Sequence, residues 1–89
     1  KWAEAIKVIM PTFKDGGTHV NISGMALAKN APNRENALKF MEFMVSDTAQ
    51  KMHAQLNFEY PVKAGIGLDE TVASFGELKP DRLSIAEIA

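Results

Sequence analysis

The segment from Gly16 to Lys29, GGTHVNISGMALAK, constrains the fold more than any other part of the sequence. Its first half alternates between polar and apolar side chains, which is the period of a β-strand with one buried face. The polar members of this alternation are His19, Asn21 and Ser23. The pattern therefore predicts a strand whose second face is not packed into a core.

The second half of the same segment has a different character. Gly24 interrupts the alternation, and Met25 to Ala28 is apolar on both faces, as in a strand buried inside a sheet. A glycine inside a strand marks a bulge, a bend or a close backbone contact. The surroundings of the strand are thus expected to change at Gly24. A second, shorter β-prone stretch runs from Lys7 to Met10.

The rest of the chain, residues 30–89, is predicted to be mainly helical. Asn33 suits the N-cap of a helix from Arg34 to Val45, and Ser46 suits the N-cap of another from Asp47 to Leu56. Apolar side chains repeat at helical spacing in both, so each helix has one face shaped to cover a sheet, and the fold class is α/β. The repeating residues are Ala37, Phe40, Met41, Met44 and Val45, then Ala49, Met52, His53 and Leu56.

Short sequence signals predict where other helices begin or end. Asn57 suits a left-handed C-cap for the second helix. A weak helical segment from Glu70 to Phe75 is followed by Gly76, which closes it. Ser84 with Glu87 three residues later fits a capping box, so a helix is expected to begin there.

The composition of the chain excludes several classes of protein. At 89 residues the chain is one domain at most, and its core must be small. A net charge of −1 without a basic cluster argues against a nucleic-acid partner. No apolar run approaches the roughly 20 residues that span a membrane, and the lack of cysteine excludes disulfides and thiolate zinc sites. Lys1 to Ile6 resembles the tail of a helix and Ile85 to Ala89 the start of one, so a piece of a longer protein is expected.

Two histidines are the candidates for metal binding or acid–base chemistry. His53 lies on an apolar helical stripe, which favours a packed or hydrogen-bonded side chain. His19 lies on the polar strand face and is the better candidate for lining a cleft. A helical metal pair needs a second ligand one turn away, and the residues one turn from His53 are not usual ligands. A small metal-dependent hydrolase that uses either histidine with nearby carboxylates is the alternative from another class of protein.

A set of short motifs is spread through nearly the whole chain. They are Gly17-Thr18-His19-Val20-Asn21 with Ser23-Gly24, then Asn36-Ala37, Glu42-Phe43, Ser46-Asp47 with Ala49-Gln50, and Glu59-Tyr60-Pro61-Val62. Together they resemble the C-terminal part of bacterial periplasmic ferric-iron-binding proteins, the solute-binding components of iron(III) ABC transporters. The tail from Leu83 to Ala89 is also similar to this family.

The resemblance implies a fold. Residues 1–89 would be a single C-terminal fragment of a two-lobed protein with the type II periplasmic-binding-protein fold. Residues 1–29 would include a strand that crosses between the lobes as a hinge, and the helices of residues 30–89 would pack on a sheet. His19, Asn21 and Ser23 would then line the cleft between the lobes.

The resemblance also implies a function. The full-length protein would capture ferric iron in the periplasm and pass it to the membrane permease of an ABC transporter, so it would be a transport component and not an enzyme. A solute-binding protein for another ion or for a small anion is the alternative within this class.

The iron ligands are not expected in this chain. Proteins of the family hold Fe³⁺ largely with tyrosine phenolates, often an adjacent pair, because a hard cation prefers anionic oxygen. The only tyrosine here is Tyr60, for which packing or a structural hydrogen bond is expected. No metal ligand, cofactor ligand or catalytic residue is therefore assigned, and no cofactor is expected for the chain alone.

The apolar helical stripes lead to an expectation about assembly. A chain with one long strand and two amphipathic helices leaves several hundred Å² of apolar surface open, more than soluble monomers usually expose. A homodimer that covers this surface is therefore expected if the chain folds by itself.

Overall fold

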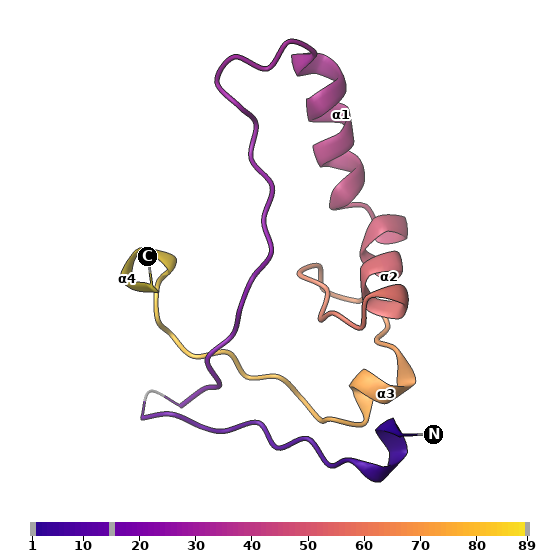
Figure 1. Cartoon of the computed structure of the whole chain (residues 1–89), viewed down its shortest axis with the longest axis vertical. Helices are drawn as coiled ribbons and strands as arrows, with labels where there is room; N and C mark the ends of the chain where they lie inside the picture. Colours follow the sequence, from indigo (N-terminus) through magenta and orange to yellow (C-terminus); the bar gives the residue numbers. More distant parts are fainter. Residues whose placement is uncertain (1, 15, 89) are drawn as a thin grey trace.

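The structure, a computed structural model, describes residues 2–14 and 16–88 of the chain. A short 3-10 helix, η1 (Ala3–Ala5), is followed by the α-helices α1 (Arg34–Met44), α2 (Asp47–Leu56), α3 (Glu70–Ala73) and α4 (Ile85–Ile88). Figure 1 shows α1 and α2 following one another along one side of the molecule. The segment that leads into α1 runs without a helix along the opposite side (Figure 1).

The predicted sheet is not formed within residues 2–14 and 16–88, where no strand occurs. One isolated bridge pairs Thr18 with Pro80 in parallel. A strand needs a neighbouring segment that exchanges ladder hydrogen bonds with it, and no backbone hydrogen bond joins residues 19–27 to another described segment. The alternating pattern of residues 18–23 thus lies on an unpaired segment, and its role as a hinge strand stays a prediction.

The two long helices lie where the sequence predicts them. α2 has the predicted bounds, and α1 ends at Met44, one residue earlier than expected. The Ser46 hydroxyl accepts a hydrogen bond from the backbone N–H of Ala49 at 3.3 Å, so Ser46 caps α2. Asn33 occupies the N-cap position of α1, but its side chain makes no capping hydrogen bond.

The end of α2 corrects the predicted C-cap. Asn57 has φ −103° and ψ −5°, which is right-handed, and the residue with positive φ is Phe58, at 57°. The backbone N–H groups of Asn57 and Glu59 both donate to the carbonyl oxygen of His53. Because both N–H groups share this acceptor, the left-handed residue is Phe58. It lies one residue after the position that the left-handed preference of asparagine predicted.

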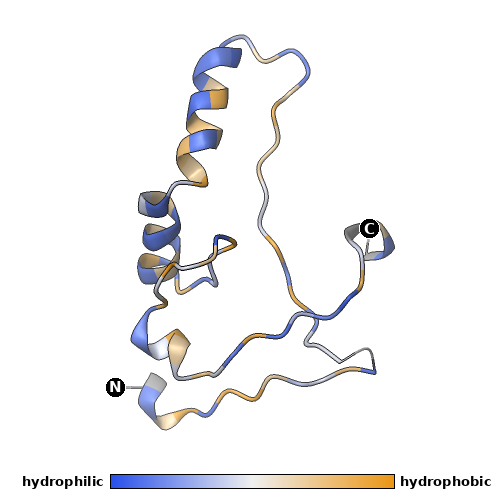
Figure 2. Ribbon diagram, turned by 180° about the vertical axis from the view of Figure 1, so that it is seen from behind, coloured by the Kyte–Doolittle hydropathy of each residue, from blue (hydrophilic) through white to orange (hydrophobic). Residues whose placement is uncertain are grey.

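The chain has an open shape and a small core. Its radius of gyration is 16.0 Å, whereas a compact domain of this length has about 12 Å. Among the described residues the buried apolar side chains are Ala49, Ala54 and Val72, on α2 and α3. Figure 2 shows apolar stretches on the helices and along the extended segment facing them. None of the helices described is long and apolar enough to cross a lipid bilayer.

Candidate functional site

A groove of about 670 Å³ lies between the extended segment and the helices. One wall is the segment 18–25, which brings the three predicted cleft residues, His19, Asn21 and Ser23, to the same hollow. The opposite wall comes from the end of α1, from α2 and from the loop after α2. Its apolar members are Met41, Met44, Val45, Phe58, Pro61 and Val62.

At one end of the groove two segments that are distant in sequence cross. The Thr18 N–H donates to the carbonyl oxygen of Lys79 at 2.7 Å, and the Asp81 N–H donates to the carbonyl oxygen of Thr18 at 2.9 Å. Gly17 is buried at this point, and a Cβ there would overlap backbone atoms of Pro80 and Asp81. The close approach of the two backbones therefore requires glycine at position 17.

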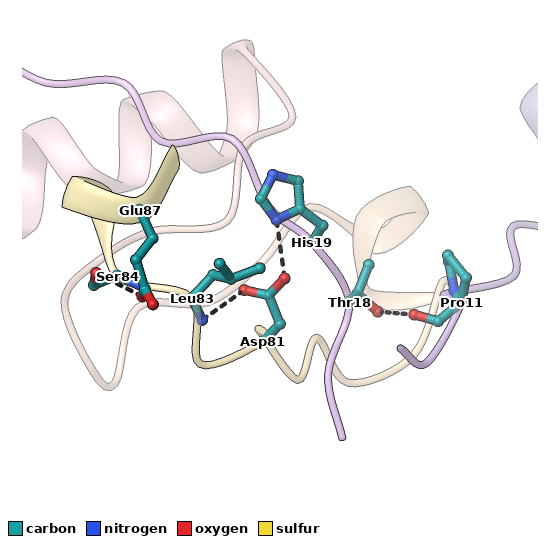
Figure 3. Close-up of polar contacts among 7 residues, drawn as sticks. All are labelled: Pro11, Thr18, His19, Asp81, Leu83, Ser84 and Glu87. Carbon is teal, nitrogen blue, oxygen red and sulfur yellow. Dashed lines mark hydrogen bonds and ion pairs between the residues drawn. The ribbon is translucent and has the colours of Figure 1, made fainter. Parts of the chain in front are cut away.

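Asp81 holds His19 at the crossing (Figure 3). His19 Nδ1 lies 2.9 Å from Asp81 Oδ2, and Asp81 Oδ1 accepts from the Leu83 N–H at 3.3 Å. The Asp81 side chain is 6% exposed, whereas that of His19 is 48% exposed. Because a carboxylate only accepts hydrogen bonds, Nδ1 is the donor in this contact. His19 thus has a fixed orientation at the margin of the groove.

Two further side-chain contacts lie near the crossing (Figure 3). Thr18 Oγ1 donates to the Pro11 carbonyl oxygen at 2.8 Å. The predicted capping box is half formed, since the Glu87 N–H donates to the Ser84 carbonyl oxygen and not to the Ser84 hydroxyl. The Ser84 hydroxyl and N–H both donate to Glu87 Oε2, at 2.7 and 2.9 Å. These two hydrogen bonds, the hydroxyl's first, hold the pKa of the Glu87 carboxyl below its ordinary value.

Gln50 and His53 tie the opposite wall together. Gln50 is buried; its Nε2 donates to the Met44 carbonyl oxygen at 3.0 Å, and its Oε1 accepts from the Val62 N–H at 2.9 Å. His53 Nδ1 lies 3.2 Å from Glu59 Oε2, a polar contact between α2 and the loop that follows it. The loop after α2 is therefore fastened to the helix at two points.

Tyr60 has the structural contact predicted for it. Its hydroxyl lies 3.5 Å from the carbonyl oxygen of Gly76 and can donate to it. Within the part of the chain that the structure describes, no three histidine, aspartate or glutamate side chains gather closely enough to hold a metal ion. The groove thus offers single polar groups and not a closed set of ligands.

A surface ion pair joins α2 to the loop after it. Asp47 pairs with Lys63, from the loop after the helix, and not with Lys51 one turn away. The hydrogen bond and then the charge of Lys63 lower the pKa of the Asp47 carboxyl, and the charge of Lys51 contributes least among the causes.

Sequence reasoning missed two residues of the groove and the crossing. Asp81 is 62 positions from His19, and nothing local to it indicates a histidine partner. Gln50 directly follows Ala49 on the apolar stripe of α2, and both are buried. A polar side chain next to a core position is a signal that could have identified Gln50, because buried amides need hydrogen-bond partners.

Comparison with known sequences gives a family and close relatives. The sequence model of a family described as bacterial extracellular solute-binding protein matches residues 1–80. Iron uptake protein A1 of Synechocystis sp. is 52% identical over 86 residues, which are 97% of this chain and 24% of that protein. Iron uptake protein A2 of the same organism is 42% identical over 87 residues, covering 96% of this chain and 25% of that protein.

Comparison with solved structures gives the same result. The Bordetella ferric binding protein superposes with a TM-score of 0.87 at 61% identity, covering 98% of this chain and 27% of that one. The apo ferric ion-binding protein A of Pasteurella haemolytica superposes with a TM-score of 0.78 at 43% identity, covering 84% and 23%. These similarities confirm the resemblance predicted from the motifs. The chain spans about a quarter of the length of the relatives that it matches.

Proposed function

The chain belongs to the family of bacterial extracellular solute-binding proteins, and from that premise we propose that it is part of a protein that captures ferric iron for import. The observation that carries this proposal is the 61% identity to the Bordetella ferric binding protein over 98% of the chain. The two iron uptake proteins of Synechocystis sp. support the same solute. The family and its ferric-binding members place the protein in the periplasm, as the sequence predicted.

The chain's own contribution is part of the scaffold and of the cleft. In the two-lobed type II fold, residues 18–23 act as the hinge strand, and His19, Asn21 and Ser23 face the cleft between the lobes. This is supported by the groove that these three side chains share and by the crossing that fixes the end of the segment. The orientation that Asp81 imposes on His19 suits a side chain that faces a ligand cleft.

Fe³⁺ is the cargo of the complete protein, and the chain alone does not hold it. Tyr60 is engaged with Gly76, and each histidine lies against one carboxylate. A hard trivalent cation needs several anionic oxygen ligands around it. The iron ligands therefore come from other parts of the full-length protein.

The protein passes its solute to the membrane permease of an ABC transporter and is not an enzyme. The relatives are named for iron uptake and ferric binding, which favours transport over the metal-dependent hydrolase considered from the two histidines. A solute-binding protein for another ion or a small anion is the second candidate. The homodimer expected from the apolar stripes stays a prediction.

A chimera tests the proposed function. The segment of the Bordetella ferric binding protein that aligns with this chain is replaced by residues 1–89, and ferric citrate is titrated into the chimera and into the chain alone. The chimera should develop the visible charge-transfer band of phenolate–iron coordination, and the chain should develop none. A folded chimera without the band would contradict ferric iron as the solute. A band in the chain alone that disappears in Tyr60→Phe would contradict the absence of ligands.

A further inference from the structure

Four polar residues on one face of α2 contact the segment that follows the helix. This segment, residues 58–63, which we call the strap, bends back beside α2 before the chain enters α3 (Figure 1). The residues of α2 that contact the strap are three or four positions apart, so they lie on the same face of the helix. They are Asp47, Gln50, His53 and the C-cap residue Asn57.

The N-terminal half of α2 contacts the far end of the strap. Asp47, the first residue of the helix, pairs with Lys63. Gln50, almost one turn further on, accepts a hydrogen bond from the Val62 N–H at 2.9 Å. Gln50 is 7% exposed, whereas the side chains of the ion pair are 47% and 65% exposed. Because exposed ion pairs contribute little to stability, the hydrogen bond of Gln50 is the main fastening at this end.

The C-terminal end of α2 contacts the near end of the strap. Glu59 Oε2 lies 3.2 Å from His53 Nδ1, and Glu59 Oε1 accepts from Asn57 Nδ2 at 3.4 Å. The Glu59 N–H also donates to the carbonyl oxygen of His53 at 3.3 Å. The strap therefore runs antiparallel to the helix and is fastened near both of its ends.

The backbone is strained where the strap begins. Within residues 2–14 and 16–88, Phe58 is the one residue other than glycine that has a positive φ, at 57°. In the left-handed region a Cβ lies too close to the following carbonyl oxygen, which lowers the population of that conformation roughly tenfold. Strain of this kind persists only where the surrounding contacts over-determine the backbone. Here those contacts are the ones that Glu59, the next residue, makes with the end of α2.

We propose that the strap is a strained element with two arrangements. In the latched arrangement α2 holds residues 59–63, and Phe58 keeps its positive φ. In the released arrangement Phe58 returns to a negative φ, and the strap leaves the polar face of α2. Residues 58–62 also line the groove, so release of the strap changes the wall of the groove. The inference goes beyond the proposed function and does not depend on the identity of the solute.

Two substitutions at Phe58 separate the backbone strain from the aromatic ring. Phe58→Gly removes both, whereas Phe58→Ala removes the ring and keeps a Cβ in the left-handed region. Amide exchange of Glu59 and Val62 reports release, because both N–H groups are donors in the latched strap. Exchange should be about fivefold or more slower in Phe58→Gly than in Phe58→Ala, since only glycine adopts positive φ without strain. Equal rates in the two variants would overturn the proposal.

A substitution at the far end of the strap tests whether its two ends are coupled. Gln50→Leu removes the acceptor of the Val62 N–H. The strong nuclear Overhauser effect between the amide and Hα protons of Phe58, which marks a positive φ, should weaken in this variant. It should persist in the control Gln55→Leu, at an exposed position of α2. If Gln50 held Val62 only locally, the Phe58 signal would be unchanged in Gln50→Leu, and that result would overturn the proposal.

The variants are compared in two proteins, the 89-residue chain and the Bordetella chimera described above. The contacts that carry the proposal all lie within residues 47–63, so the same order of exchange rates is expected in both. If only one of the two proteins folds, its rates decide. A folded protein in which Phe58 shows a negative φ before any substitution would also overturn the proposal.

Discussion

The helical region of residues 34–62 and the extended region of residues 17–29 differ in where their backbone hydrogen-bonding groups find partners. In the helical region the backbone groups of α1 and α2 pair within each helix, and Ser46 caps α2. Gln50 joins the two helices to each other and to the loop. In the extended region the backbone groups of residues 19–27 have no partner in another described segment. Helical hydrogen bonds join residues close in sequence, so a helix can form within a short segment. A strand instead needs a pairing partner, which can be far away in the chain.

The largest effect is expected at Gly17, where the extended region crosses residues 79–81. Gly17→Ala puts a Cβ against the backbone of Pro80 and Asp81, which cannot move aside as a flexible side chain can. We expect a loss on the order of 3 kcal/mol at the crossing and rapid exchange of the Thr18 and Asp81 amides.

The matched control is Gly24→Ala, in the same extended segment. A Cβ at Gly24 meets nothing within 4 Å, and Gly24 does not have a positive φ. Urea unfolding followed by tryptophan fluorescence and amide exchange would compare the two variants. If both lowered stability equally, the close contact at Gly17 would not be the cause.

The next effect tests whether the helical region is fastened by its own side chains. Gln50→Leu keeps the size of the side chain but leaves the Met44 carbonyl and the Val62 N–H without their partner. Losing these two partly buried hydrogen bonds costs about 2 kcal/mol of unfolding free energy. Gln55→Leu, at an exposed position of the same helix, is the control and should be nearly neutral. Urea midpoints and the Val62 amide exchange rate are the measurements; an unchanged Val62 rate in Gln50→Leu would show that the amide does not hold the loop.

Helix capping gives a smaller effect within the helical region. Ser46→Ala removes the hydroxyl that accepts from the Ala49 N–H and should cost about 1 kcal/mol. Asn33→Ala, at the N-cap of α1, should cost less, because that side chain makes no capping hydrogen bond. Far-ultraviolet circular dichroism during urea unfolding would rank the two. A larger loss for Asn33→Ala would reverse the assignment of the caps.

The smallest effect is the pH dependence of the capping box at α4. Because the pKa of Glu87 is lowered in the folded chain, its contribution is present above the ordinary glutamate pKa and is lost as pH falls through the lower folded value. A carbon-detected NMR titration of the Glu87 carboxyl should show the lowered pKa, and Ser84→Ala should raise it toward the ordinary value. An unchanged Glu87 pKa in Ser84→Ala would exclude the hydroxyl as the main cause.

The parts of the fold that could be predicted from the sequence are those encoded within a few residues. The bounds of α2, the Ser46 cap and the contact between Ser84 and Glu87 follow from spacing alone. The C-cap at Asn57 was predicted wrongly because the carbonyl of His53, shared by two N–H groups, sets the turn and outweighs residue preference. A sheet could not be built from the alternating pattern, since pairing partners are not encoded in the strand itself.

The candidate site was predicted on one side only. The polar face of the extended segment identified His19, Asn21 and Ser23, which do share a groove. The partner that orients His19 comes from 62 residues further on and could not be inferred from local spacing. The class of protein in which such a groove occurs was indicated by the family resemblance and not by the spacing of residues.

The crossing at Gly17 also bears on the order in which contacts form. Helices such as α1 and α2 nucleate on a timescale of about a microsecond or less. The bonds between Thr18 and Asp81 instead close a loop of more than 60 residues. Closing this loop reduces the chain entropy before any contact across it can stabilise the fold. The crossing is therefore among the last contacts made and the first released. Its glycine governs how long the native arrangement persists once formed, and has little influence on how quickly the helices appear.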